Sequence, residues 1–380
     1  MTTAPRERLL ALDVFRGMTI AAMLLVNNPG SWAAIYPPLT HAPWHGWTPT
    51  DVIFPFFLFI VGITTHFSLE GRRSRGDDER AILRQIIRRG VLIIVLGWLL
   101  ASFPYWPITR FTEIRIPGVL QRIGVAYIFA ALLTRRGSLK QQVGIIATLL
   151  LGYWFAMTLL PVPGQEGIGV DWLDQPGKTL AAWVDRALLD GHLWRQSRTW
   201  DPEGVLSTIP AIGTAMLGVF AGRWIRSDRT LDERLAGLFA VGAIGMMLGL
   251  MWHWSFPINK SLWTSSYVLF TGGMAATTLA AILWITDVHR VRWWTRPFVI
   301  YGVNPIIAFV GSGMMARVIY SLWKVEYAGA PTAVQSVVYR ELFASWLAPK
   351  NASLAFALAF VGVWLGILYV LDRRRIYLKV

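Results

Sequence analysis

The sequence of 380 residues contains no cysteine, and this absence excludes several kinds of chemistry. A disulfide, a thiolate metal ligand and a cysteine nucleophile are all ruled out. Charged residues are also scarce, at 15% of the chain, whereas 54% of the residues are hydrophobic. A polar stretch long enough to form a separate soluble domain is missing too. The chain is therefore expected to consist mainly of apolar segments.

Apolar runs of about 20 residues recur along the chain, the length that a helix needs to cross a bilayer core. The runs are continuous rather than alternating, which predicts helices and not the strands of a barrel. The first run follows two arginines directly, and we expect a retained helix rather than a removed signal peptide. We predict one all-α polytopic transmembrane domain over 1–380, with about ten helices at 9–27, 52–70, 87–105, 118–134, 141–160, 204–223, 235–253, 264–287, 298–320 and 352–371.

Acidic residues are few, with 22 Asp and Glu against 36 Lys and Arg, which gives a net charge of +14. With the N-terminus inside, 23 of these 36 basic residues fall in cytoplasmic segments and ten in outer loops. Cytoplasmic loops of membrane proteins carry such an excess. We therefore predict that both termini are cytoplasmic. The distribution of the basic residues is therefore explained by membrane topology. Nucleic-acid binding is not expected.

This orientation places the polar segment 40–55 and the long segment 161–203 on the outer face. A loop as long as 161–203 is usually functional or disordered. Within it, 179–189 has apolar residues at helical spacing, which predicts a short amphipathic helix on the membrane surface. The outer face is therefore the side on which we expect the functional site.

The segment 40–55 carries two of the six histidines, His41 and His45. Imidazole titrates near neutrality and can act as a general base. Asn27 ends the first predicted helix and Asp51 begins the second, so both frame this segment. A carboxylate beside an imidazole fixes its tautomer and stabilises the imidazolium, and Asp51 can equally cap the second helix. We predict that His41 is the chemical centre, with Asp51 and Asn27 as its partners.

A metal site is not expected here. His41 and His45 have the spacing of a helical pair of ligands, but Pro43 between them disfavours a helix. Among the other histidines, His192 lies in the long outer loop and is a candidate for substrate contact. The remaining three fit structural or solvated roles.

Polar side chains inside apolar helices are costly and usually functional. Asp13 and Arg16 are three residues apart on one helix face and are expected to pair, either as an anchor or at a site. Pro305 follows Asn304 within the ninth predicted helix and should break it, and broken helices at membrane depth tend to line a cavity. The outer segments add polar and aromatic residues suited to sugar hydroxyls and rings, although tryptophans are also common at membrane interfaces. The predicted substrate-binding residues are Trp44, His45, Arg115, Arg122, His192, Asp201, Glu203, Asn259, Lys260, Trp263 and Asn304.

Several motifs resemble the heparan-alpha-glucosaminide N-acetyltransferase family, and they cover nearly the whole chain in matching order. They are 12–17 (LDVFRG), 26–27 (VN), 41–46 (HAPWHG), 51–55 (DVIFP), 115–127 (RIPGVLQRIGVAY), 160–164 (LPVPG), 201–206 (DPEGVL) and 259–267 (NKSLWTSSY). The resemblance implies transfer of acetyl from cytoplasmic acetyl-CoA to the amino group of a glucosamine-type sugar at the outer face. The family's proposed active histidine falls on His41, its asparagine on Asn27 and its aspartate on Asp51.

The chain also departs from the animal members of that family. They have asparagine where His45 stands, and a Gly-His pair where this chain has Gly311 and Ser312. Relative to these members, the chain is expected to lack the extra lumenal domain and the leading span. It therefore resembles the compact bacterial branch, expected as a multi-pass protein of the inner membrane linked to N-acetylglucosamine use.

In the enzyme so implied, His41 deprotonates the sugar amine or carries the acetyl group, while Asp51 orients the ring. Asn27 or Asn304 would donate to the oxyanion. Phosphates bind arginine forks, so the CoA phosphates are expected at the cytoplasmic residues Arg72, Arg73, Arg88, Arg89, Arg290 and Arg292.

Two other functions stay open. One is a transporter of N-acetylglucosamine-type sugars, favoured by the broken helix but not by the missing internal repeat. The other is an O-acyltransferase of an envelope polysaccharide. A homodimer is compatible with all three.

Overall fold

The computed structural model describes residues 9–106 and 113–378. Eight helices of this part are long and apolar enough to cross a membrane. They are α1 (Leu10–Asn27), α2 (Ile53–Arg73), α3 (Glu79–Ser102), α5 (Leu139–Leu159), α7 (Val205–Ile225), α8 (Leu231–His253), α9 (Ser265–Leu283) and α13 (Pro349–Arg373). The prediction of a helical polytopic membrane protein is confirmed, since the described part is mostly helical and contains only one short β-hairpin.

Two further apolar elements account for the other predicted spans. α4 (Val119–Thr134) is a shorter apolar helix. α10 (Thr295–Val303) and the stretch Ile307–Leu322 form a pair bent by 85°, which makes a ninth span if the two are counted together. The total of ten and the cytoplasmic termini stay predictions.

The described residues divide into two compact units by their contacts. Unit 1 holds residues 9–41, 48–54 and 279–378, and unit 2 holds 42–47, 55–106 and 113–278. Each unit has its own helix packing, and the two are described separately below. The prediction that 1–380 acts as one transmembrane domain stays a prediction.

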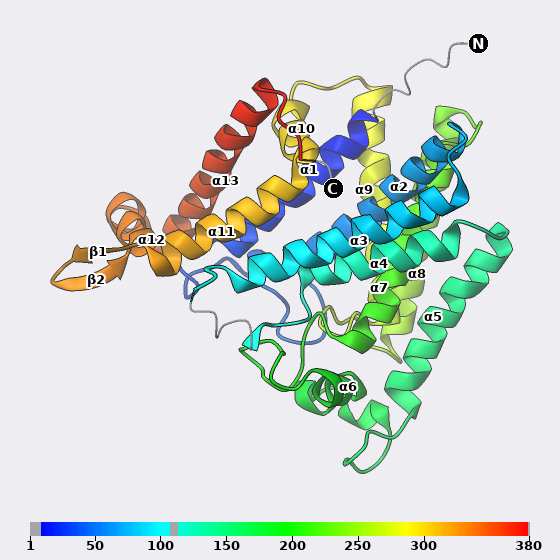
Figure 1. The fold of residues 1–380 in the computed structure, drawn as a ribbon, viewed down its shortest axis with the longest axis horizontal. Helices are drawn as coiled ribbons and strands as arrows, with labels where there is room; N and C mark the ends of the chain where they lie inside the picture. Colours follow the sequence, from blue (N-terminus) through cyan, green and yellow to red (C-terminus); the bar gives the residue numbers. More distant parts are fainter. Residues whose placement is uncertain (1–8, 107–112, 379–380) are drawn as a thin grey trace. The chain divides into compact units, whose positions relative to one another are not determined.

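Unit 1 is built on close packing of α1 and α10 (Figure 1). A Cβ atom at Gly17 would lie 1.7 Å from the carbonyl oxygen of Phe298, and one at Gly302 would lie 2.2 Å from that of Asp13. Only glycine permits backbones to approach so closely. α13 packs against both helices.

The rest of unit 1 is a series of short elements. Pro305 has no N–H to continue α10, and the 85° bend follows it, so the predicted break is confirmed. β1 (Lys324–Tyr327) and β2 (Ala330–Ala333) form an antiparallel hairpin with Lys324 opposite Ala333. The short elements are η1 (Pro37–Leu39), η2 (Pro49–Val52), η6 (Trp284–Val288), η7 (Ile307–Gly311), α11 (Ser312–Arg317), η8 (Val318–Leu322), β1 (Lys324–Tyr327), β2 (Ala330–Ala333), α12 (Val334–Tyr339) and η9 (Arg340–Ala344).

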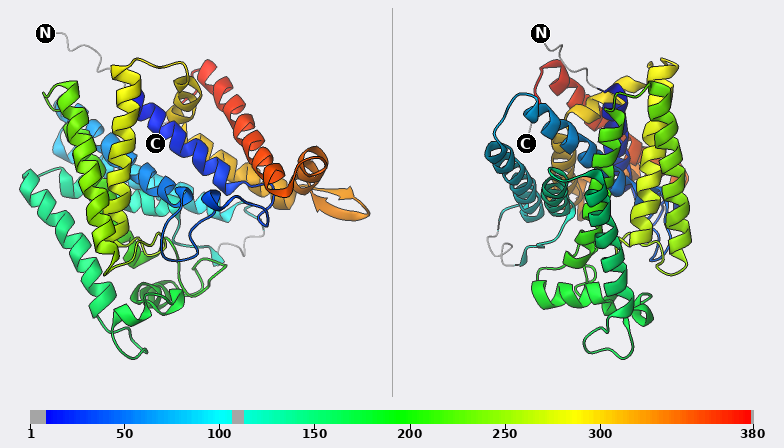
Figure 2. Two further views of the ribbon diagram at one scale, coloured as in Figure 1. Left: turned by 180° about the vertical axis from the view of Figure 1, so that it is seen from behind. Right: turned by 90° about the vertical axis from the view of Figure 1, so that its right-hand side faces the viewer.

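Unit 2 packs α2 on α7 and α3 on α4, and the latter two run side by side in Figures 1 and 2. A Cβ atom at Gly62 would lie 1.9 Å from the carbonyl oxygen of Ala215, again a contact that only glycine allows. The long loop contains η4 (Gly169–Trp172), η5 (Pro176–Lys178) and α6 (Leu180–Leu189). α6 is the helix predicted at 179–189.

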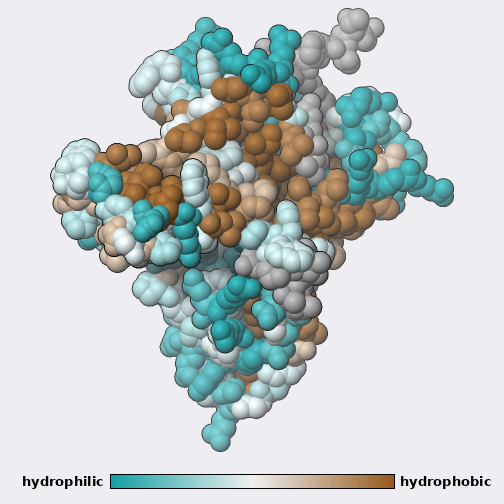
Figure 3. Space-filling view, turned by 60° about the vertical axis from the view of Figure 1, so that its left-hand side comes forward, coloured by the Kyte–Doolittle hydropathy of each residue, from teal (hydrophilic) through white to brown (hydrophobic). Residues whose placement is uncertain are grey.

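Apolar side chains cover much of the helix surface. On α8, Val241, Ile244, Met247 and Met251 are each more than half exposed. Figure 3 shows broad areas of hydrophobic residues on one face. Exposed apolar areas of this extent fit contact with lipid rather than with water.

Candidate functional site

His41 and Asp51 form a close pair in unit 1. Nδ1 of His41 donates to Oδ1 of Asp51 at 2.6 Å. The carboxylate is buried, at 1% exposure, whereas the imidazole is 51% exposed. A buried acceptor therefore holds a ring that is itself half exposed.

The local sequence explains this geometry. Pro49 opens η2 at a position where a missing N–H costs nothing, and Thr48 and Asp51 form a capping box around it. Oδ2 of Asp51 accepts from the backbone N–H of Thr48 at 3.0 Å. Oγ1 of Thr48 donates to the carbonyl of Thr40 at 2.6 Å, which holds the residue before His41. Asp51 thus serves at once as helix cap and as partner of His41, the two roles that the sequence left open.

The geometry of the pair is compatible with general-base chemistry. With Nδ1–H held by the carboxylate, Nε2 is the basic nitrogen of the ring. A carboxylate in this position stabilises the positive charge that the ring gains when it accepts a proton. The arrangement can therefore take a proton from an incoming nucleophile.

Asn27 and Asn304 lie at different positions along the axis of α1. Asn27 is the last residue of α1 and is exposed. Asn304 is fully buried and lies near Asp13, because Gly302 packs on the carbonyl of that residue. Asp13 precedes Asn27 by 14 residues, roughly 21 Å of helix. Leu39 and Leu25 line one pocket, so the segment before His41 lies near the end of α1. Asn304 lies near the other end of this helix. This separation argues against Asn304 as an oxyanion donor beside His41.

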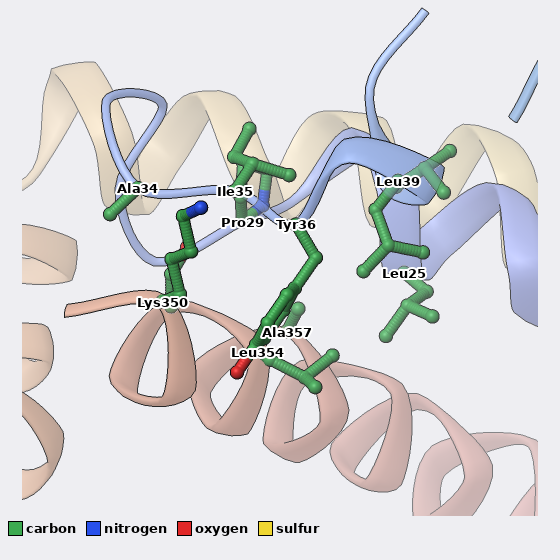
Figure 4. A pocket seen from close by; sticks show the side chains of 11 residues that line it. Leu25, Pro29, Ala34, Ile35, Tyr36, Leu39, Lys350, Leu354 and Ala357 are labelled. Atoms are coloured by element: carbon green, nitrogen blue, oxygen red, sulfur yellow. The ribbon is translucent and has the colours of Figure 1, made fainter. Parts of the chain in front are cut away.

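Figure 4 shows that pocket, between the segment after α1 and the start of α13. Its cavity volume is only about 10 Å³, and its lining is mostly apolar. Tyr36 points across it toward α13 and hydrogen-bonds Asn351, while Lys350 lies at its edge. Small-molecule sites usually enclose about 300 to 1,000 Å³, so this pocket is better explained as imperfect packing.

The other ten predicted substrate-binding residues all lie in unit 2. Three of them form one ion-pair cluster. Nε of Arg115 donates to Asp201 at 2.8 Å, and its Nη2 pairs with both Asp201 and Glu203. Burial lowers the pKa of Arg115, but the two carboxylates more than reverse this and raise it. Burial raises the pKa of Glu203, and the charge of Arg115 outweighs it, so that pKa lies below its usual value.

Asp185 of α6 forms hydrogen bonds with the backbone of the same segment. Its carboxylate accepts from the N–H of Asp201 at 3.1 Å and from that of Val205 at 2.9 Å. Burial raises the pKa of Asp185 to about 6, although these two hydrogen bonds act in the opposite direction. Asp185 could not be selected from the sequence, because its partners lie 16 and 20 residues further on.

Arg122 is buried beside this cluster, at 2% exposure. Its Nη2 donates to Oγ of Ser207 at 2.5 Å and to the carbonyl of Gly204 at 3.3 Å. Its guanidinium lies 5.0 Å from the ring of Trp263, and the indole N–H of Trp263 donates to Thr214 at 3.1 Å. Arg122 and Trp263 therefore form a buried cation–π pair that supports the start of α7.

His45 joins two outer segments of unit 2. Its Nε2 donates to Asp174 at 2.8 Å, and its Nδ1 accepts from the side chain of Asn259 at 3.2 Å. Next to it, the indole N–H of Trp44 donates to the carbonyl of Leu173 at 2.8 Å. The ring of Trp44 meets that of Trp200 edge-on at 5.3 Å. Asp174 and Trp200 were not among the predicted residues.

Two more predicted residues lie around the cluster. Nδ1 of His192 donates to the carbonyl of Ile114 at 2.9 Å, and the carbonyl of His192 accepts from Ile116 at 3.0 Å. His192 thus fixes the segment that carries Arg115. The charge of Lys260 acts on Glu203 and helps to lower its pKa. The structure brings these residues into one region of unit 2, and their role in binding stays a prediction.

The six arginines predicted to hold CoA divide between the units. In unit 2, Arg72 pairs with Asp77 at 2.8 Å, Arg73 donates to a backbone carbonyl, and Arg89 stacks on Tyr127 at 5.1 Å. Arg88 is exposed. In unit 1, Arg290 is exposed and Nε of Arg292 donates to the carbonyl of Thr286 at 2.9 Å.

Among the described residues, no three His, Cys, Asp or Glu side chains are grouped so that they could hold a metal ion. Asp13 and Arg16 pair on α1, as expected from their spacing.

The apolar helices and the imidazole held by a buried carboxylate define a polytopic membrane protein with a candidate acid–base centre. Residues 8–247 match the family described as heparan-alpha-glucosaminide N-acetyltransferase, catalytic, and the chain belongs to that family. It is 29% identical to heparan-alpha-glucosaminide N-acetyltransferase of Homo sapiens and 30% identical to that of Mus musculus.

Both comparisons cover 98% of the chain but only 60% and 61% of the relatives. The chain thus spans about three fifths of the length of these curated relatives. The family match contains His41 and Asp51, whereas Asn259, Lys260, Trp263 and Asn304 lie beyond it.

Proposed function

We propose that this protein is a membrane acetyltransferase that moves acetyl from acetyl-CoA to the amino group of a glucosamine-type sugar. Family membership supports the reaction class, since the relatives are named as N-acetyltransferases of a glucosaminide. The observation that carries the proposal is the half-exposed His41 imidazole, 2.6 Å from the buried carboxylate of Asp51. An amine needs such a base to lose its proton as it attacks a thioester.

In the direct route, the sugar nitrogen attacks the thioester carbonyl carbon while Nε2 of His41 takes a proton from that nitrogen. The new C–N bond forms, the C–S bond breaks, and CoA leaves as a thiol after taking up a proton. In the alternative route, Nε2 itself attacks the carbonyl and forms an acetyl-imidazole, which the amine then cleaves. Asp51 stabilises the positively charged ring in both routes.

We assign the donor to the cytoplasmic side and the acceptor to the outer side of a bacterial inner membrane. The excess of basic residues in the predicted inner segments supports ten spans with both termini inside. Arginines of those segments would hold the CoA phosphates. A role of Trp44 and His45 in sugar binding is part of this proposal, and within unit 2 the ion pairs of Arg115 with Asp201 and Glu203 hold the segment 201–203.

A CoA-release assay on the purified protein tests this function against its alternatives. With acetyl-CoA and glucosamine, we expect acceptor-dependent release of CoA and formation of N-acetylglucosamine. Release of CoA in a burst without acceptor would select the acetyl-imidazole route. Uptake of sugar without CoA release would instead support a transporter, and an O-acetylated product would support the polysaccharide O-acyltransferase.

A further inference from the structure

We infer that Asn304 forms a subsite for the amide groups of the pantetheine arm of CoA, and that residues 374–378 occupy this subsite in the free protein. This inference rests on the proposed function, because it names a donor subsite of the same enzyme. All the residues concerned belong to unit 1.

Asn304 sits at the break between α10 and the stretch that begins at Ile307. Its side chain is fully buried, and a buried carboxamide must find hydrogen-bond partners. Both partners come from the main chain of one short segment. Nδ2 donates to the carbonyl of Ile376 at 3.1 Å, and Oδ1 accepts from the N–H of Leu378 at 3.3 Å.

The segment that covers Asn304 turns back from the end of α13, as Figure 1 shows. Arg375 reverses the chain in the left-handed conformation, with φ of 55°. The N–H of Ile376 then bonds the carbonyl of Leu371 at 2.9 Å. The side chains of Ile376 and Leu378 stay 48% and 50% exposed. A lightly packed surface segment therefore covers a completely buried amide.

The chemistry of this contact indicates what else can fill the subsite. In this contact the side chain of Asn304 donates one hydrogen bond and accepts one. Residues 376–378 supply the carbonyl that accepts and the N–H that donates. The pantetheine arm carries two secondary amides, which offer the same groups on a flexible apolar chain. The arm and the segment would thus compete for one pair of hydrogen bonds.

The position of Asn304 along unit 1 fits an incoming donor. It lies at the level of Asp13, near the start of α1, and away from the end of that helix. In the proposed topology this is the cytoplasmic end, from which acetyl-CoA would enter. An occupied subsite reduces apparent affinity in proportion to the fraction of protein that is closed.

Hydrogen exchange on the full-length protein tests the competition. We expect CoA, and pantetheine alone, to speed amide exchange in residues 374–378. Adenosine 3′,5′-bisphosphate, which lacks the arm, should leave this exchange unchanged. Exchange that stays constant or slows when CoA binds would overturn the inference.

A matched pair of variants tests the same point by affinity. Leu378→Pro removes the N–H that bonds Asn304, whereas Leu378→Ala keeps it. The proline variant loses one of the two hydrogen bonds that hold residues 374–378 on Asn304. Its Kd for CoA should therefore be about fivefold lower than that of the alanine variant. Equal Kd values would overturn the inference while leaving the proposed function intact. Failure of the unaltered protein to bind CoA would overturn both.

Discussion

At the residue scale, Asp51 both caps a helix and pairs with His41, and replacing it should affect both roles. Asp51→Asn keeps the shape but removes the charge that supports the His41 imidazolium. We expect turnover to fall roughly 100-fold or more. The weakened cap should also cost about 1 kcal/mol of stability, seen as a lower Tm.

Thr48→Ala separates these two tasks. It removes the hydroxyl that bonds Thr40 and Asp51 but leaves Asp51 beside His41. Stability should drop by about 1 kcal/mol with a much smaller loss of turnover. Equal losses of turnover in the two variants would contradict a direct role of Asp51 at His41.

Asp185 gives the molecule a predictable response to pH. Its pKa is raised to about 6 by burial, so the folded state favours the protonated carboxyl. The stability that this proton provides is lost as pH rises through about 6. We expect the Tm to fall between pH 5 and 7, and Asp185→Asn to flatten this fall. Glu203 does not interfere in this window, because its pKa is lowered from 4.5. An unchanged slope in the variant would contradict the assignment.

Sequence reasoning at the residue scale succeeded where partners are close along the chain. His41 and Asp51 are ten residues apart and flank one helix start, so their pairing could be predicted. His45 instead meets Asp174 and Asn259, which are 129 and 214 residues away. No local pattern encodes such distances. The height of Asn304 along α1 could not be predicted for a related reason, because it follows from the packing of Gly302 and not from a local motif.

At the scale of helices, the contact of α1 with α10 depends on Gly17. Gly17→Ala would place a Cβ atom 1.7 Å from the backbone oxygen of Phe298, so the two helices must separate. We expect a loss of about 2 kcal/mol or more. Gly362→Ala in α13 is the matched control, because its Cβ atom would meet nothing within 4 Å and alanine favours helix. Similar Tm values for the two variants would contradict the packing.

The helices themselves were the most predictable feature. Continuous apolar runs set the span positions, and Pro305 fixed the break in the ninth. The bend of 85° was not predictable, since it depends on what packs around the break. The close helix pairs were also missed, because a glycine in an apolar run does not reveal which backbone it will meet.

At the scale of the whole molecule, the absence of cysteine makes the topology easy to measure. A single introduced cysteine is the only thiol that a maleimide can label. In intact cells, an impermeant maleimide should label Glu166→Cys in the long outer loop. It should label Asp228→Cys only after the membrane is opened. The reverse pattern would contradict the proposed orientation. The unaltered chain, which has no cysteine, is the negative control for labelling.

The proposed role of His41 in acetyl transfer to an amino sugar is tested most directly by one rate measurement. N-acetylglucosamine formed from acetyl-CoA and glucosamine is quantified for the unaltered protein, for His41→Ala and for His289→Ala, a control at an exposed histidine. We expect the His41 variant to lose at least about 100-fold in turnover and the control to keep the full rate. A His41→Ala protein that is folded and forms product at the unaltered rate would contradict the account.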